Sequence, residues 1–184
     1  MRIVVGADDE GPVVETVVDE LRSRGHEVTV FEREEWPRVA ARVARAVAAG
    51  EADQGMLFCW TGTGTSMAAN KVPGARAALA WEPWIAEGAR KWNDANVLVM
   101  SLKRTEPETA RAIVDAWLSV EEPDPDDRET VVTMSLSDRG DSTGVVVVQA
   151  GFATEARRAL HVDGWTDCLD RLQELMSSRG SAEG

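Results

Sequence analysis

Short apolar, β-branched runs alternate with helix-like segments through the first 120 residues of this chain. Residues 2–6 form the first run, and residues 11–24 follow with valine and leucine at helical spacing before a glycine. Such alternation is typical of βαβ units, in which crossover helices join parallel strands. We therefore predict an α/β fold, a Rossmann-like three-layer sandwich with a parallel sheet between two layers of helices. The other strands are predicted at residues 27–31, 54–60, 77–81 and 96–101, and the other helices at residues 39–49, from about residue 64, 83–92 and 107–118.

The composition changes at residue 121, where EEPDPDDRE is acidic and contains proline, as linkers do. Two strand-like runs follow at residues 130–136 and 144–150, with turn-forming residues between them. Residues 154–177 are then predicted to form one amphipathic helix. Its apolar side is marked by Leu160, Trp165, Leu169, Leu172 and Leu175.

These boundaries divide the chain into an α/β domain at residues 1–121, an acidic linker at 122–129 and a small ββα appendage at 130–184. An appendage of about 60 residues is small for an independent hydrophobic core. We therefore expect it to pack on the first domain or across a dimer.

Charge and cysteine content restrict the partners and the compartment. The net charge of −12 argues against nucleic acid or an anionic membrane as the main partner, because phosphate groups would be repelled. The start, MRIVVGADDE, is acidic by residue 8, so we interpret it as a core strand and not as a signal peptide. No apolar run approaches the roughly 20 residues that cross a bilayer. With only two cysteines, Cys59 and Cys168, no disulfide framework or metal cluster is indicated, and we expect a cytoplasmic protein.

The sequence CWTGTGTSMAANK at residues 59–71 stands at a predicted strand-to-helix junction. Gly62 and Gly64 let the backbone approach a ligand closely, and the N–H groups at a helix start favour an anion. An unliganded tight turn is the alternative. The loop lacks the ending of a P-loop and the spacing of a dinucleotide fingerprint, so nucleotide binding is disfavoured and no cofactor is expected.

Cys59 ends the strand immediately before this loop. The field of the helix start favours a thiolate there, which would make Cys59 a usable proton acceptor. A small buried core residue is the alternative, and the position alone does not separate the two. Cys168, within the C-terminal helix, is interpreted as structural.

The first 120 residues resemble ribose-5-phosphate isomerase B and the related galactose-6-phosphate isomerase subunits. The resemblance rests on GADDEG after the first strand, GEADQGMLFCWTGTGTSMAANKVPGARAAL in the middle, and ARKWNDANVL followed by IVDAWL. It implies an aldose–ketose isomerase that acts through a cis-enediolate. It also implies a homodimer or a dimer of dimers, in which the partner subunit completes each site.

The resemblance implies a role for each matching residue. Cys59 would move the proton between C1 and C2, and Thr61 would assist at the hydroxyl. Asp8 would hold sugar hydroxyls, and Asn93 would line the pocket. The enediolate oxygen would be stabilised by the backbone N–H groups of Gly62, Thr63, Gly64, Thr65 and Ser66.

The chain also departs from the family's pattern at five positions. Asp9 stands where a histidine is usual after the first-strand aspartate, and Trp92 replaces the histidine thought to open the sugar ring. Trp60 replaces the glycine after the cysteine. Lys103 stands where the family has an arginine directed at phosphate, and PDPDDRE replaces an arginine-rich tail, for which Arg128 is a partial substitute.

These departures make the predicted pocket less favourable for a phosphate dianion. Tryptophans near its expected mouth suit the apolar faces of sugar rings, and they are Trp60, Trp81, Trp84 and Trp92. Filling the core is the alternative for Trp81 and Trp84. Trp117 is predicted to lie in the core, and the role of Trp36 is left undecided.

Two functions therefore remain open from the sequence. The leading hypothesis is an isomerase of a sugar phosphate or another sugar derivative, since both Cys59 and Thr61 are present. The alternative is a non-catalytic sugar-binding or regulatory protein, which the loss of both histidines favours.

The C-terminal sequence GVVVVQAGFATEARRALHVDGWTDCLDRLQELM, residues 144–176, resembles the last strand and long helix of the START-like, helix-grip family. Most of that fold has no counterpart here, so the resemblance implies no ligand. We expect this piece to serve dimer contacts or to cap the neighbouring site.

Overall fold

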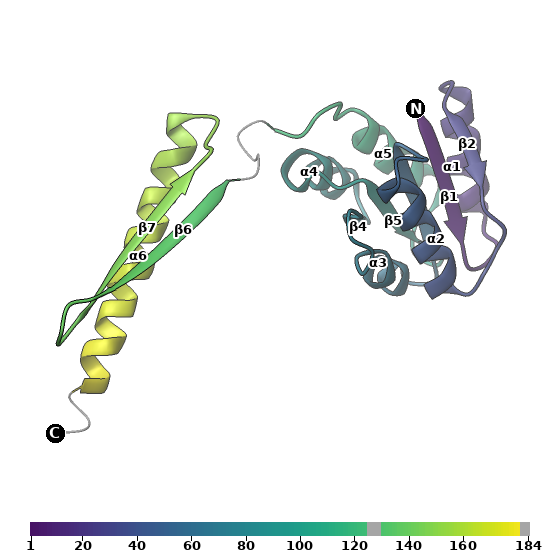
Figure 1. The fold of residues 1–184 in the computed structure, drawn as a ribbon. Coiled ribbons are helices and arrows are strands. Elements are labelled where there is room, and N and C mark those ends of the chain that lie inside the picture. The colour runs from purple at the N-terminus through teal and green to yellow at the C-terminus, as the bar shows by residue number, and fades with distance from the viewer. Residues whose placement is uncertain (125–129, 181–184) are drawn as a thin grey trace. The chain divides into compact units, whose positions relative to one another are not determined.

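Five parallel strands form the central sheet of the first unit, Met1–Pro123, in the computed structural model, which describes residues 1–124 and 130–180 (Figure 1). The strand order is β2-β1-β3-β5-β4, and every neighbouring pair is parallel. The predicted parallel sheet is confirmed. Its strands are β1 (Arg2–Ala7), β2 (Glu27–Val30), β3 (Gln54–Cys59), β4 (Ala77–Leu79) and β5 (Val97–Ser101).

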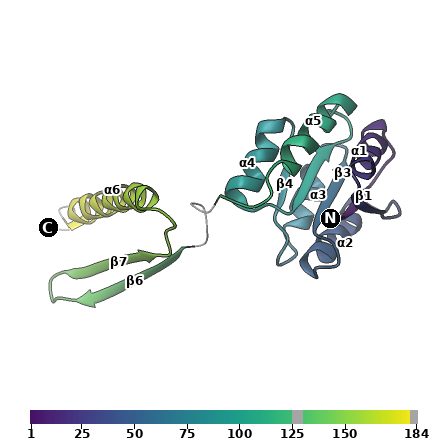
Figure 2. The ribbon, with the colours of Figure 1, turned by 90° about the horizontal axis from the view of Figure 1, so that it is seen from above.

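Helices cover both faces of this sheet, as predicted for a Rossmann-like sandwich (Figure 2). One face packs against α1, α4 and α5, and the other against α2 and α3. Helix α2 begins earlier than predicted because a proline is tolerated in the first helical turn. The helices are α1 (Pro12–Ser23), α2 (Trp36–Ala48), α3 (Thr63–Ala69), α4 (Pro83–Asn93) and α5 (Pro107–Leu118).

Helix α2 packs closely on β1 and β3 because two glycines face it. A Cβ added to Gly6 would lie 2.6 Å from Val39 Cγ2, and one added to Gly55 would lie 2.6 Å from Val43 Cγ1. Both distances are shorter than any van der Waals contact. The two glycines therefore fix the distance between this helix and the sheet, and with it the position of the first residue of α2, Trp36.

The order in which successive strands are added to the sheet reverses after β2, so that β2 and β3 lie on opposite sides of β1. From β1 the chain crosses through α1 to β2 on one side, and it then returns through α2 on the opposite face to β3 on the other side. Such a reversal leaves a crevice at the carboxyl ends of the two strands, which is where open α/β sheets bind ligands. Asp8 follows β1 and Cys59 ends β3, so both residues lie at this point.

The second unit, Asp124–Gly184, contains an antiparallel hairpin of β6 (Val131–Asp138) and β7 (Thr143–Ala150), followed by α6 (Glu155–Gly180). The Trp165 indole Nε1 donates to Gln149 Oε1 at 2.7 Å and so ties α6 to β7. Among the described side chains of residues 130–177, none is buried. Most of the predicted linker at 122–129 lies outside the described residues, and so does Arg128.

The apolar side predicted for α6 is only partly covered. Trp165 and Leu169 are half-buried, whereas Leu160, Leu172 and Leu175 are 64%, 45% and 49% exposed. The hairpin is shorter than the helix, which leaves part of the helix without a strand to pack on. Within residues 1–124 and 130–180, no helix is long and apolar enough to span a membrane.

Trp117 lies in the core as predicted, with no exposed surface, and its Nε1 donates to Gln54 Oε1 at 2.6 Å. We expect Trp117→Phe to lower the free energy of unfolding by about 1–3 kcal/mol, because it leaves the buried Gln54 acceptor without its donor. Urea denaturation measures this change. The control is Trp81→Phe, at a side chain that is 63% exposed. Equal losses in the two variants would contradict the importance of the buried hydrogen bond.

Candidate active site

A cavity of about 370 Å³ lies at the crevice between the ends of β1 and β3. It combines residues from the β1 end, the start of α2 and the loop after β3. Cys59, Thr61 and Asp8, which the sequence singled out, are therefore brought together. The lining residues are Asp8, Trp36, Cys59, Trp60, Thr61, Thr63 and Gly64.

Cys59 is 5% exposed and lines this cavity. Its sulfur lies 3.3 Å from the Thr65 hydroxyl oxygen, which is also 3.2 Å from the Gly62 carbonyl oxygen. Thr61 Oγ1 lies 2.7 Å from Thr63 Oγ1, so the two hydroxyls next to the cysteine form a hydrogen-bonded pair. A thiol and exchangeable hydroxyl protons thus share one cavity, an arrangement suited to proton transfer.

Gly62 sets the path of the loop. Its φ of 80° is left-handed, and an added Cβ would lie 2.4 Å from Leu79 Cδ1, so a side chain is excluded on both counts. Helix α3 begins at the next residue, Thr63.

Three of the five backbone N–H groups predicted to bind an oxyanion are already engaged. Gly62 N–H donates to Cys59 O at 3.2 Å, Ser66 N–H donates to Gly62 O at 3.1 Å, and Thr63 N–H donates to Thr61 Oγ1 at 3.4 Å. The first-turn N–H groups of Gly64 and Thr65 have no acceptor four residues back in the helix. The predicted anion-binding stretch therefore narrows to these two residues.

Asp8 presents an unsatisfied acceptor beside the cavity. Its Oδ1 atom is buried and finds no hydrogen-bond partner among the described residues. Burial raises the pKa of the Asp8 carboxyl, and the neighbouring Asp9 charge raises it further. A buried acceptor of this kind suits the hydroxyl donor of a ligand.

Trp60 is held over the mouth of the cavity by three neighbours. Its Nε1 donates to Asp9 Oδ2 at 3.2 Å, and Lys103 Nζ lies 4.8 Å from its ring centroid. Its carbonyl accepts from Ser101 Oγ at 2.6 Å. The Glu10 backbone N–H, and after it the Trp60 indole, lower the pKa of Asp9, which therefore remains a carboxylate. The ring is nevertheless 59% exposed.

The sequence did not indicate Trp36 and Ser101 as site residues. The Trp36 ring lies against Gly64, where an added Cβ would be 3.1 Å from Trp36 Cε3. Ser101 pairs with Cys59 across β5 and β3, and its Oγ also accepts from the Lys103 and Arg104 N–H groups. The only sequence signal for Ser101 was its place at the end of the strand predicted at residues 96–101.

The family is decided by comparison with known proteins. The model of the Ribose/Galactose Isomerase family matches residues 3–134. This chain belongs to that family. It is 42% identical over 126 residues to ribose-5-phosphate isomerase B of Escherichia coli K12. That alignment covers 65% of this chain and 85% of the relative. The chain is 36% identical over 128 residues to D-erythrulose-4-phosphate isomerase of Pectobacterium atrosepticum, covering 66% and 84%.

A solved structure shows the same relationship. Clostridium thermocellum ribose-5-phosphate isomerase B superposes with a TM-score of 0.63 at 40% identity, covering 66% of this chain and 86% of that one. The match to the family model ends at residue 134. The resemblance of residues 144–176 to the START-like family is not confirmed and stays a prediction.

Trp92 and Asn93, which the isomerase family's pattern assigns to the pocket, do not line the Cys59 cavity of the same chain. Helix α4 ends at Asn93. The next residue, Asp94, accepts hydrogen bonds from the guanidinium of Arg76, and Arg76 lies immediately before β4. These residues therefore lie at the amino ends of the strands, whereas Cys59 lies at the carboxyl ends. Within one protomer the predicted site residues of this isomerase are split between two edges of the sheet.

Trp81 precedes α4 and Trp84 belongs to it, and both are on the surface. Trp81 and Trp84 are 63% and 61% exposed, so the alternative that they fill the core is wrong. Trp84 and Trp92 meet edge to face, with ring centroids 5.8 Å apart, and Trp92 packs on Gly88. This exposed aromatic pair is distinct from the cavity-lining pair, Trp36 and Trp60.

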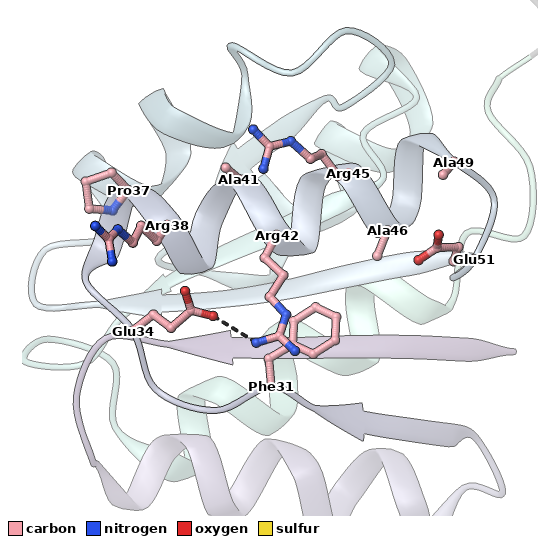
Figure 3. A pocket seen from close by; sticks show the side chains of 10 residues that line it. All are labelled: Phe31, Glu34, Pro37, Arg38, Ala41, Arg42, Arg45, Ala46, Ala49 and Glu51. Atoms are coloured by element: carbon pink, nitrogen blue, oxygen red, sulfur yellow. Dashed lines mark hydrogen bonds and ion pairs between the residues drawn. The ribbon is translucent and has the colours of Figure 1, made fainter.

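A second cavity, of about 790 Å³, lies along the outer face of α2 but lacks the features of a catalytic site (Figure 3). Arg42 reaches down to Phe31 and pairs with Glu34 at 2.8 Å, whereas Arg45 points away from them. Because its arginines diverge, they do not converge on one anion. Within the described ranges, no three His, Cys, Asp or Glu side chains are placed to hold a metal ion.

Asp8 and Asp9 are expected to affect stability in opposite directions. A raised folded-state pKa means that Asp8 favours folding at low pH, and this contribution is lost as the pH rises through that pKa. A lowered pKa means that Asp9 favours folding at neutral pH, and its contribution is lost as the pH falls through that pKa. At about pH 7 we expect Asp8→Asn to raise the melting temperature by about 2 °C and Asp9→Asn to lower it by a similar amount.

Thermal melts of the wild type and both variants, from about pH 7 down to about pH 3, test this pair. Both differences should shrink as the pH falls, because the carboxyl groups become protonated in the folded and unfolded chains alike. Melting shifts of the same sign at neutral pH would contradict the assignment.

Proposed function

We propose that this chain is an aldose–ketose isomerase in which Cys59 is the acid/base residue. The single observation that carries the proposal is the placement of Cys59 in the switch-point cavity beside Thr61 and Asp8. Membership of the ribose/galactose isomerase family supports the same reaction. The proposed reaction moves one proton between C1 and C2 of an open-chain sugar.

The proton and electron movements follow from this arrangement. The Cys59 thiolate takes the proton from C2, and the C2–H electron pair shifts toward the C1 carbonyl, giving a cis-enediolate. The N–H groups of Gly64 and Thr65 stabilise the negative oxygen. The remaining hydroxyl proton passes from O2 to O1 with the help of Thr61, and the Cys59 thiol returns its proton to C1. The product is a ketose, and the thiolate is regenerated.

The substrate class is a sugar phosphate or a related sugar derivative. By their names, the two relatives compared above act on ribose 5-phosphate and D-erythrulose 4-phosphate. Here the Asp8 acceptor suits a sugar hydroxyl, and the exposed Trp60 ring suits the apolar face of a sugar. Lys103 offers a cation, but the Asp9 carboxylate nearby offsets part of its charge. A phosphate dianion would therefore bind more weakly here than at an uncompensated cation.

The working form is proposed to be a homodimer in which the partner completes each site. The split of Cys59 and Asn93 between two edges of the sheet supports this, because the two residues meet only if they come from different copies. The exposed Trp84–Trp92 pair also supports a partner at the Asn93 edge. Among its described residues the second unit buries no side chain by itself, which favours its predicted role in dimer contacts. A cytoplasmic location accords with such a metabolic role.

Exchange of the C2 proton tests the chemistry directly. Ribose 5-phosphate, allose 6-phosphate, galactose 6-phosphate, erythrulose 4-phosphate and free pentoses are incubated with the protein in deuterated water, and loss of the C2 or C1 proton signal is followed by NMR. Cys59→Ala should slow the exchange by at least about 100-fold, because it removes the acid/base group. Cys168→Ser, at the exposed cysteine, is the matched control and should exchange at the wild-type rate.

Exchange that does not depend on Cys59 would sink the proposed mechanism. If the wild type exchanges none of these sugars, the isomerase proposal fails, and the non-catalytic sugar-binding alternative takes its place.

Hybrid dimers test the shared site. Cys59→Ala and Asn93→Ala chains are co-expressed with different tags, and the hybrid is isolated by two affinity steps. One of its two sites then carries both substitutions and the other carries neither, so we expect about half of the wild-type activity although both parent dimers are inactive. A hybrid as inactive as its parents would show that Cys59 and Asn93 do not meet across a dimer.

A further inference from the structure

In the part of the chain that the structure describes, the Thr65 hydroxyl is the only one that donates a hydrogen bond to the Cys59 sulfur. Thr65 has no exposed surface, and its Oγ1 lies 3.3 Å from Cys59 Sγ and 3.2 Å from the Gly62 carbonyl oxygen. A threonine hydroxyl has one hydrogen and two lone pairs. It can therefore donate fully to only one of these two acceptors at a time.

The contact with Gly62 has an ordinary local explanation, but the contact with Cys59 does not. Threonines in helices often bond to the carbonyl three or four residues back, which is the relation of Thr65 to Gly62. The sulfur, in contrast, belongs to the end of β3 and not to α3. The left-handed turn at Gly62 brings the helix start back beside the strand end and so places the hydroxyl against the sulfur.

We propose that Thr65 is a positioning residue that holds the Cys59 sulfur in both protonation states of the isomerase cycle. This inference rests on the proposed function, in which Cys59 takes a proton from C2 and returns it to C1. While Cys59 is a thiolate, the Thr65 hydroxyl donates to the sulfur. Once the sulfur holds the proton, the Thr65 hydrogen turns to the Gly62 carbonyl, and the S–H group is free to face the substrate carbon.

The Thr65 hydroxyl keeps its hydrogen throughout the proposed catalytic cycle. No bond to its oxygen forms or breaks, and its hydroxyl hydrogen only exchanges one acceptor for another. The proton that moves between the carbon atoms is carried by Cys59 alone. The Thr65 side chain therefore need not touch the substrate, and its effect should fall on the proton-transfer step and not on substrate binding.

The reactivity of Cys59 toward iodoacetamide tests this role without any sugar. All variants are made in a Cys168→Ser background, so that Cys59 is the one thiol present. Thiolate is the form that reacts, and a donated hydrogen bond stabilises it. We expect alkylation near neutral pH to be about tenfold slower in Thr65→Val, which keeps the shape and removes the hydroxyl, and within about twofold of the parent in Thr65→Ser.

Two further variants keep this test decisive. Thr65→Ala also lacks the hydroxyl and is a better helix former, so it replaces Thr65→Val if that variant does not fold. Thr29→Val, at an exposed position of β2, is the matched control and should react at the parent rate. Folded Val or Ala variants that react as fast as the parent would overturn the proposal.

Steady-state kinetics give the second readout. On a sugar that the wild type isomerises, Thr65→Val should lower kcat about tenfold and leave KM within about twofold, and Thr65→Ser should restore kcat. A change confined to KM would also overturn the positioning role. If the wild type isomerises no sugar, the proposed function fails, while the alkylation rates still decide whether Thr65 holds the sulfur.

Discussion

The parallel pairing of β1 with β3 is the constraint on which the candidate site depends. Ala7 lies beside Phe58 in this pairing, and the Asp8 backbone N–H donates to Phe58 O at 3.3 Å. Neighbouring strands lie only about 5 Å apart, so the residue after β1 is necessarily close to the residue that ends β3. Close packing of α2, which the absence of side chains at Gly6 and Gly55 allows, then brings Trp36 to the same point.

The chemistry of the site follows from how differently its neighbouring groups are solvated. Asp8 keeps a buried oxygen without a partner, whereas Asp9 is exposed and is held ionised by hydrogen bonds from Glu10 and Trp60. Cys59 is buried against one hydroxyl, that of Thr65, and opens onto a cavity that holds two others. Two adjacent carboxyl groups and one thiol thus acquire separate roles from their surroundings.

The departures from the isomerase family's pattern lie on both sides of the proposed dimer site. Asp9, Trp60 and Lys103 form one connected group at the mouth of the Cys59 cavity. Trp92 lies at the opposite edge of the sheet, in an exposed pair with Trp84. A change of substrate that needs both groups would therefore involve two surfaces that meet only in the proposed dimer.

The sequence by itself determined the parallel α/β fold, the position of Cys59 at a strand end and the presence of Trp117 in the core. Each of these depends on local periodicity or on a motif of neighbouring residues, which a single sequence displays. Only the tertiary structure decided that Trp36 and Ser101 join the site, that Ser66 and Gly62 do not offer free N–H groups, and that Asn93 lies at the far edge of the sheet. These facts depend on strand order and on the path of the loop, because contacts between distant segments leave no periodic trace in the sequence.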